Sequence, residues 1–120
     1  MHKYIYQIAL KKDLLLAFKI GYYQADSLNS EGFLHCSTQE ELINTANRIF
    51  INKRDLCLLE LESAKIEAKT IYENTSGGSI LYPHIYGKLN LNAIHQCYRF
   101  EPDESGKYNF PGPSDTITLK

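Results

Sequence analysis

The spacing of apolar and polar positions divides the 120-residue chain into eight predicted elements. Runs rich in β-branched, aromatic and leucine residues predict strands, and apolar residues three and four positions apart predict helices. The predicted strands are 4–10, 32–36, 56–62, 69–73, 81–87 and 93–100, and the predicted helices are 11–20 and 39–51. We expect residues 22–30 to form a short extended segment or a turn. The order β-α-β-α-β-β-β-β predicts an α+β fold in which two helices pack against a mixed, mostly antiparallel sheet.

Each predicted helix carries an apolar stripe by which it would pack on the sheet. In the first helix the stripe consists of Leu14, Leu15 and Phe18. In the second helix the stripe consists of Leu42, Ile43, Ala46, Ile49 and Phe50.

The composition is that of one folded domain. Hydrophobic residues make up 43% and charged residues 22% of the chain, which is ordinary for a globular protein. Pro111, Gly112 and Pro113 break any regular pattern near the C-terminus. We therefore predict a single domain at 1–111, followed by an extended tail at 112–120.

Charge and cysteine content narrow the classes of function. With 13 basic and 14 acidic side chains the net charge is -1, which does not predict a nucleic-acid partner. Cys36, Cys57 and Cys97 lack the spacing of a zinc site, so we expect reduced core thiols and no metal. No apolar run is long enough for a signal peptide or a membrane span. These features predict a cytoplasmic protein without a membrane partner, and they leave its oligomeric state open.

Two histidines are the strongest candidates for chemistry, because imidazole titrates near neutral pH. His35 lies near the end of a predicted strand and just before a helix N-terminus, where α/β folds tend to bind anions. His84 follows Pro83, which fixes the local backbone, and comes soon after the glycine-rich segment 74–79. The alternative for both is a hydrogen-bonded histidine of the core.

The neighbours of the histidines complete the candidate site. Ser37 and Thr38 would donate hydrogen bonds to a ligand, and either would also cap the second helix. Ser37 with Glu40 three residues later fits a capping box. Cys36 follows His35 in a strand, so the two side chains point to opposite faces and do not predict a catalytic dyad.

Aromatic and acidic residues near the second histidine are further candidates. Tyr82 and Tyr86 would stack on a base, and Glu73 would make a polar contact with a ligand. Glu60 and Glu62 share one strand face, and we expect both to be solvated.

Several short runs resemble a known family. They are Ser27-Leu28, Gly32-Phe33-Leu34-His35-Cys36-Ser37, Thr45-Ala46-Asn47-Arg48-Ile49-Phe50, Leu58-Leu59-Glu60 and Tyr82-Pro83-His84-Ile85-Tyr86-Gly87. In this order they resemble the small, mostly bacterial family of the domain of unknown function 952, from about residue 4 to residue 111. The resemblance implies an ADP-ribosyltransferase-like roll, a fold that binds NAD between two small sheets.

The resemblance also implies roles for particular residues. His35 resembles the early-strand histidine or arginine that contacts the nicotinamide ribose, and Tyr82 or Tyr86 would stack on the nicotinamide. The catalytic glutamate of ADP-ribosyltransferases has no matching motif here, so Glu60 or Glu73 would have to serve.

Three functions follow from these residues. The first is a cleft for NAD or another nucleotide, built around His35 and His84, with ADP-ribosyl or phosphate transfer as its reaction. The second is a non-catalytic module that binds a small metabolite or a protein. The third, which we rank lower, is a two-histidine phosphoesterase, because His35-Cys36-Ser37 provides one His-x-Ser element whereas His84-Ile85-Tyr86 lacks the short hydroxyl.

Overall fold

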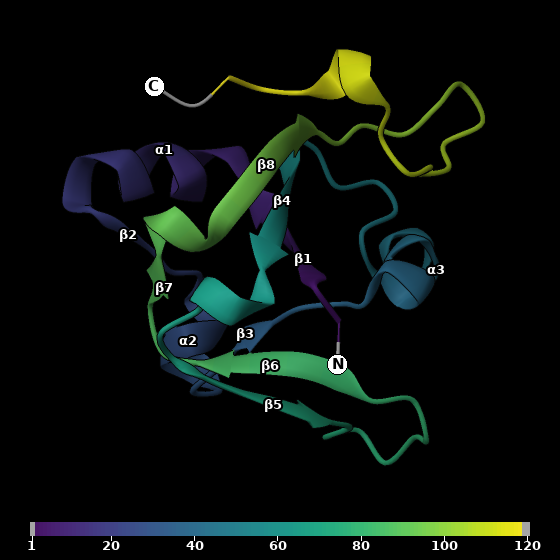
Figure 1. Ribbon diagram of the computed structural model, residues 1–120. Coiled ribbons are helices and arrows are strands. Elements are labelled where there is room, and N and C mark those ends of the chain that lie inside the picture. The colour runs from purple at the N-terminus through teal and green to yellow at the C-terminus, as the bar shows by residue number, and fades with distance from the viewer. Residues whose placement is uncertain (1, 119–120) are drawn as a thin grey trace.

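The largest sheet is built from three long strands. In the computed structural model, which describes residues 2–118, β1 (Tyr4–Leu10) pairs antiparallel with β4 (Leu56–Glu62) along its full length. On its other side β4 pairs antiparallel with β8 (Ile94–Arg99). Figure 1 shows these three strands in the middle of the molecule. The bounds of β1 and β4 agree with the sequence prediction, and β8 lies within the predicted range 93–100.

A second three-stranded sheet carries the histidines. Its strands are β3 (Leu34–His35), β6 (Tyr82–Tyr86) and β5 (Lys69–Glu73), in that spatial order and all antiparallel. In Figure 1 the β5-β6 pair crosses beneath the first sheet. The predicted mostly antiparallel arrangement is therefore confirmed for the described strands, although they form separate sheets.

Short elements connect these layers. β2 (Tyr22–Tyr23) and β7 (Leu89–Asn90) form a two-stranded antiparallel sheet. Three single turns of 3₁₀ helix are η1 (Ser63–Lys65), η2 (Leu91–Ala93) and η3 (Pro113–Asp115).

The two faces of the β1-β4-β8 sheet enter two clusters of the hydrophobic core, because successive strand residues point to opposite faces. The face that includes Ile5 packs on α1 (Lys11–Ile20) and on the β3-β6-β5 sheet. The face that includes Ile8 packs on α3 (Gln39–Ile49). The α+β prediction is thus confirmed.

The helices differ from the sequence prediction in their number and in the residues that they bury, and α3 ends at Ile49, which is 51% exposed although it belongs to the predicted stripe. A third helix, α2 (Asp26–Ser30), lies where an extended segment or a turn is predicted. It is five residues long and buries none of them, so it carries no apolar stripe. In α1 the buried residues are Leu14 and Ala17, whereas the predicted stripe residues Leu15 and Phe18 are 60% and 39% exposed. The predicted stripe is therefore confirmed for Leu14 and wrong for Leu15 and Phe18, because the helix meets the core through the i, i+3 pair Leu14 and Ala17.

Thr38 is the N-cap of α3. Its side chain accepts a hydrogen bond from the backbone N–H of Glu41 at 3.3 Å. The capping box on Ser37 is therefore wrong, and the alternative with Thr38 as cap is confirmed.

The C-terminal segment is attached to the domain at two places. The buried Tyr108 donates its hydroxyl to the carbonyl of Phe50 at 3.1 Å, and its N–H donates to Asn47 Oδ1 at 2.7 Å. Further along, the N–H of Ile117 donates to the carbonyl of Cys97 in β8 at 2.7 Å. The division of the chain into 1–111 and 112–120 stays a prediction, and residues 1, 119 and 120 lie outside the described residues.

Candidate functional site

A cavity of about 700 Å³ opens beside β1, the edge strand of the largest sheet. Its lining comes from β1, from α1 and α2, from β3 and β6, from α3, and from residues 74–76 after β5. Because these segments are far apart in the sequence, the cavity exists only in the folded chain.

The register of β3 on β6 places His35 directly opposite His84. Their ring centroids lie 5.2 Å apart at an angle of 70°, and both rings line the cavity. The ring of Phe33 lies against both, 4.7 Å from His35 and 4.2 Å from His84. The structure thus brings the two candidate histidines together at one point.

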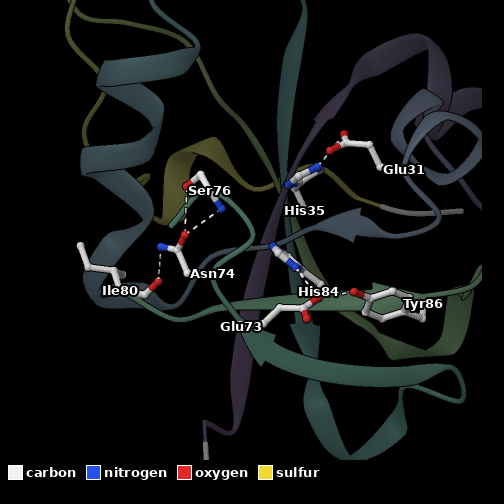
Figure 2. A network of polar contacts seen from close by, with 8 residues as sticks. All are labelled: Glu31, His35, Glu73, Asn74, Ser76, Ile80, His84 and Tyr86. Carbon is white, nitrogen blue, oxygen red and sulfur yellow. Dashed lines mark hydrogen bonds and ion pairs between the residues drawn. The ribbon is translucent and has the colours of Figure 1, made fainter. Parts of the chain in front are cut away.

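A glutamate holds each imidazole through one of its two nitrogens. Nε2 of His35 lies 2.8 Å from Oε2 of Glu31, and Nδ1 of His84 lies 2.9 Å from Oε2 of Glu73. Figure 2 shows the other nitrogen of each ring turned toward the space between the rings and the segment with Ser76. Since an ionised carboxylate only accepts hydrogen bonds, the held nitrogen carries the proton, and a neutral ring presents its lone pair to the cavity. The pair can therefore take up or deliver protons there.

The two histidines differ in their exposure to solvent. The side chain of His84 is 4% exposed, whereas that of His35 is 48% exposed. His35 can exchange protons directly with water, and His84 is largely shielded from it.

Glu73 and Tyr86 lie behind His84 and do not line the cavity. The hydroxyl of Tyr86 donates to the same oxygen of Glu73 that His84 approaches. This hydrogen bond, and then the one from His84, hold the pKa of the Glu73 carboxyl below its usual range. The same bond to Glu73 raises the pKa of Tyr86. The structure therefore does not bring these two predicted ligand contacts to the cavity wall.

The remaining predicted site residues divide between cavity and scaffold. Ser37 and Tyr82 line the cavity. Thr38 does not line it, because its hydroxyl caps α3.

The structure adds cavity residues that the sequence pattern did not single out. Thr45 and Arg48 of α3 line the wall, and they lie three residues apart on one face of the helix. The Thr45 hydroxyl is buried and has no hydrogen-bond partner within residues 2–118. The only signal in the sequence is the i, i+3 spacing of a hydroxyl and a guanidinium beside the apolar stripe.

Acidic residues line the part of the cavity that α1 and α2 form. Asp13 and Asp26 belong to this part. Burial raises the pKa of Asp13, and the nearby Asp26 raises it further. Anionic groups of a ligand would be repelled here and attracted to Arg48.

The segment that follows β5 is ordered by one side chain. Asn74 Oδ1 accepts from the N–H groups of Ser76 at 2.9 Å and Gly78 at 3.0 Å, and Asn74 Nδ2 donates to the carbonyl of Ile80 at 2.7 Å. Figure 2 shows this arrangement beside α3. Residues 74–76 thus form a defined part of the cavity wall.

Two further side chains are structural. Burial raises the pKa of the Cys36 thiol, which donates to Gln7 Oε1 at 3.3 Å, so it is a poor nucleophile although it lines the cavity.

Glu60, predicted to be solvated, is 8% exposed and does not line the cavity. It accepts from the Tyr6 hydroxyl at 2.8 Å and lies 2.8 Å from His95 Nδ1. That prediction is wrong because these partners allow the carboxylate to be buried.

The described residues provide neither a metal-binding cluster nor a membrane-spanning helix. Among residues 2–118, no three His, Cys, Asp or Glu side chains gather to hold a metal ion. None of the helices in this range is long and apolar enough to cross a bilayer.

The fold is similar to that of protein CC0527 from Caulobacter crescentus. Its crystal structure superposes with a TM-score of 0.78 at 24% identity, and the match covers 88% of this chain and 93% of that chain. Its solution NMR structure gives a TM-score of 0.76, with 88% and 91% covered. At this level of identity the likeness concerns the fold alone.

Comparison with sequences gives a family and no activity. No curated protein matches the chain significantly. The model of the family described as protein of unknown function (DUF952) matches residues 8–97, well over half of the chain. This match confirms the resemblance noted from the sequence motifs, and the chain belongs to the DUF952 family.

Proposed function

We propose that the cavity binds a nucleotide-type ligand, NAD or a nucleoside phosphate, and that His35 and His84 contact its ribose or phosphate groups. The observation that carries this proposal is the pair of imidazoles, with centroids 5.2 Å apart, in a cavity of about 700 Å³. Cavities that bind small molecules commonly measure about 300–1,000 Å³ and combine an apolar lining with a few convergent polar groups.

Other lining residues support a nucleotide. Arg48 supplies a permanent cation and Thr45 an unpaired hydroxyl, both suited to phosphate oxygens. Tyr82 offers an aromatic face for a base. Because Asp13 and Asp26 repel anions, the phosphates would lie toward α3 and away from α1.

The reaction that these residues favour is phosphate transfer. The ADP-ribosyltransferase-like roll implied by the sequence resemblance would instead favour ADP-ribosyl transfer, which requires a glutamate beside the reacting ribose carbon. Neither Glu60 nor Glu73 lines the cavity, and each is engaged with a tyrosine and a histidine. The histidine pair, by contrast, can move protons to and from phosphate-ester oxygens.

The second candidate function is a non-catalytic module that binds a small metabolite. The inert Cys36 thiol favours it, because it is the only cysteine among the described residues that line the cavity. This function shares the ligand site and differs only in the absence of a product.

A thermal-shift screen tests the ligand class. We expect NAD, ADP-ribose or a nucleoside phosphate to raise the melting temperature of the wild type, since a ligand at 100 times its Kd adds about 2.7 kcal/mol. His35→Ala and His84→Ala should each lose this shift. His95→Ala is the matched control, because His95 is also held by a glutamate and does not line the cavity.

The outcomes separate the alternatives. A shift lost in the first two variants and kept in the third supports the nucleotide site. No shift with any nucleotide, while all four proteins are folded by circular dichroism, contradicts the proposal.

A further inference from the structure

The two histidines are held in opposite senses. Glu73 accepts a hydrogen bond from Nδ1 of His84, which leaves Nε2 toward the cavity, whereas Glu31 accepts from Nε2 of His35, which leaves Nδ1 free. The two free nitrogens therefore face one space, as Figure 2 shows. A carboxylate behind an imidazole fixes its tautomer and stabilises the imidazolium when it forms.

Resting on the proposed function, we propose that the cavity hydrolyses a phosphate ester by acid–base catalysis. His84 acts as the base and His35 as the acid, and Glu73 and Glu31 are positioning residues. The substrate class is a nucleotide phosphate ester with its phosphate between the two free imidazole nitrogens.

The step balances in protons and electrons. A water oxygen attacks phosphorus and gives a proton to Nε2 of neutral His84. The bond from phosphorus to the leaving oxygen breaks, and that oxygen keeps the electron pair and takes a proton from Nδ1 of the His35 imidazolium. His84 ends as imidazolium and His35 ends neutral, and solvent returns the proton between them.

The exposure of the two rings decides which is the acid. His35 starts as a cation, and its side chain is 48% exposed, so water and Glu31 both solvate the charge. His84 starts neutral, and its side chain is 4% exposed and stacked on Phe33 at 4.2 Å. The shielded ring with its free Nε2 toward the cavity is therefore assigned to the base, and the ring open to solvent to the acid.

The tautomers can be read directly in the unliganded protein. Long-range ¹⁵N NMR spectra of the neutral rings should show His84 with its proton on Nδ1 and His35 with its proton on Nε2. His95, whose Nδ1 also approaches a glutamate, is an internal reference within the same spectrum. A proton on Nε2 of neutral His84 would overturn the assignment of the base.

Glu73→Gln reverses one hydrogen bond while keeping the size of the side chain. The Tyr86 hydroxyl would hold the new carbonyl oxygen, so the amide NH₂ would face His84 Nδ1 and move the ring proton to Nε2. We expect the His84 spectrum to change in this variant and the His95 spectrum to stay. Tyr86→Phe, which leaves the carboxylate on His84, should keep the wild-type tautomer.

Activity is measured with bis(p-nitrophenyl) phosphate and adenosine 2′,3′-cyclic phosphate. His35→Ala and His84→Ala should each lower kcat about 10²- to 10⁴-fold. Glu73→Gln should lower kcat at least about tenfold with little change in KM, because the ligand contacts remain. His95→Ala should leave both constants unchanged. The wild-type rate should be bell-shaped in pH, and one limb should disappear in His35→Ala.

Nucleotide binding and ester turnover are measured separately, so each can fail without the other. Nucleotide binding that depends on His35 and His84, without turnover of either ester, overturns the acid–base step and keeps the ligand site. Turnover of bis(p-nitrophenyl) phosphate that depends on both histidines, without turnover or binding of any nucleotide, keeps the acid–base pair and contradicts the nucleotide proposal. Equal kcat in the wild type and Glu73→Gln overturns the positioning role.

Discussion

The same set of three side chains occurs twice in this protein. Glu73 accepts from Tyr86 and lies beside Nδ1 of His84, and a second glutamate in β4 has the same relation to Tyr6 and His95. Only the first set reaches the cavity, through His84. A hydrogen-bonded glutamate and histidine are therefore insufficient to mark a site, and the free ring nitrogen must also face space that a ligand can enter.

The negative charge of Asp103 is predicted to stabilise the folded state, and this can be tested by changing the pH. Its carboxylate accepts from the Ser105 hydroxyl at 2.6 Å, from Asn109 Nδ2 at 2.9 Å and from the N–H of Lys107 at 3.1 Å. These bonds lower its pKa from the ordinary 3.8 to about 2. Because the pKa is lower in the folded state, the stabilisation is present above about pH 4 and is lost as the pH falls toward about 2.

The expected result is a change in the slope of stability against pH. Urea unfolding of the wild type between pH 2 and 5 should show a falling free energy of unfolding, and Asp103→Asn should remove part of that fall. Glu104→Gln is the control, since Glu104 is an exposed carboxylate in the same turn. Equal slopes in all three proteins would show that the turn does not depend on the charge.

Residue types alone were enough to single out the two histidines that the structure brings together, and they were insufficient to place the glutamates. His35 and His84 could be singled out because imidazole titrates near neutral pH and their neighbours are apolar or hydroxyl-bearing. Glu60 and Glu73 could not be told apart, because the burial of Glu60 depends on Tyr6 and His95, which lie 54 and 35 residues from it in the sequence.

At the level of secondary structure, the candidate site depends on how β3 pairs with β6. The register sets Leu34 against Ile85 and His35 against His84. A slip of one residue would turn one histidine to the opposite face of the sheet, because side chains alternate along a strand. Leu34 and Ile85 are fully buried on the other face, so the core fixes the register and, with it, the histidine pair.

The N-terminus of α3 offers a test at the level of one helix. Thr38→Ala removes the hydroxyl that accepts from the N–H of Glu41, and it should lower the free energy of unfolding by about 1 kcal/mol. Thr38→Ser should retain most of the stability. Ser37→Ala is the matched control, because Ser37 does not cap the helix. A larger loss for Ser37→Ala than for Thr38→Ala in urea unfolding would contradict the assignment of the cap.

The pattern of residue types along the sequence predicted the positions of the long helices and strands better than those of the short ones. The strands β1, β4 and β5 and the helix α1 occupy the predicted ranges, because β-branched, aromatic or leucine residues mark the strands and Gly21 ends the helix. The helix α2 was missed because it is short and buries no side chain. The predicted strand at 32–36 shrinks to Leu34–His35, which lie in register opposite Ile85 and His84 of β6, and Cys36 adds one backbone hydrogen bond to Pro83.

At the scale of the whole molecule, the cavity could not be predicted from the sequence. Its lining runs from Gln7 to His84, and Arg48 reaches it only because α3 packs across the edge of β1. The helical pattern does not include Arg48 in the apolar stripe, and Arg48 is an exposed residue that also lines the cavity. Tertiary packing, which local spacing does not encode, makes this exposed position part of the cavity wall.

The C-terminal segment provides the test of how far the domain extends. Removing residues 112–120 deletes the bond from the Ile117 N–H to Cys97 at 2.7 Å and the bond from Arg99 Nη2 to the carbonyl of Ser114 at 2.7 Å. It also takes the half-buried Ile117 from the core and uncovers the free edge of β8.

We expect the chain that ends at Pro111 to fold and to lose about 1–3 kcal/mol of stability in urea. Ile117→Ala in the full chain is the control, and it should lose less because its backbone bond remains. Equal stability of the shortened and full chains would support the predicted boundary at 111 and a tail without a structural role.

No residue after His84 lines the cavity among residues 2–118, so the shortened chain should retain the ¹⁵N pattern of the histidine pair. Loss of that pattern in a folded, shortened chain would show that the site depends on the tail.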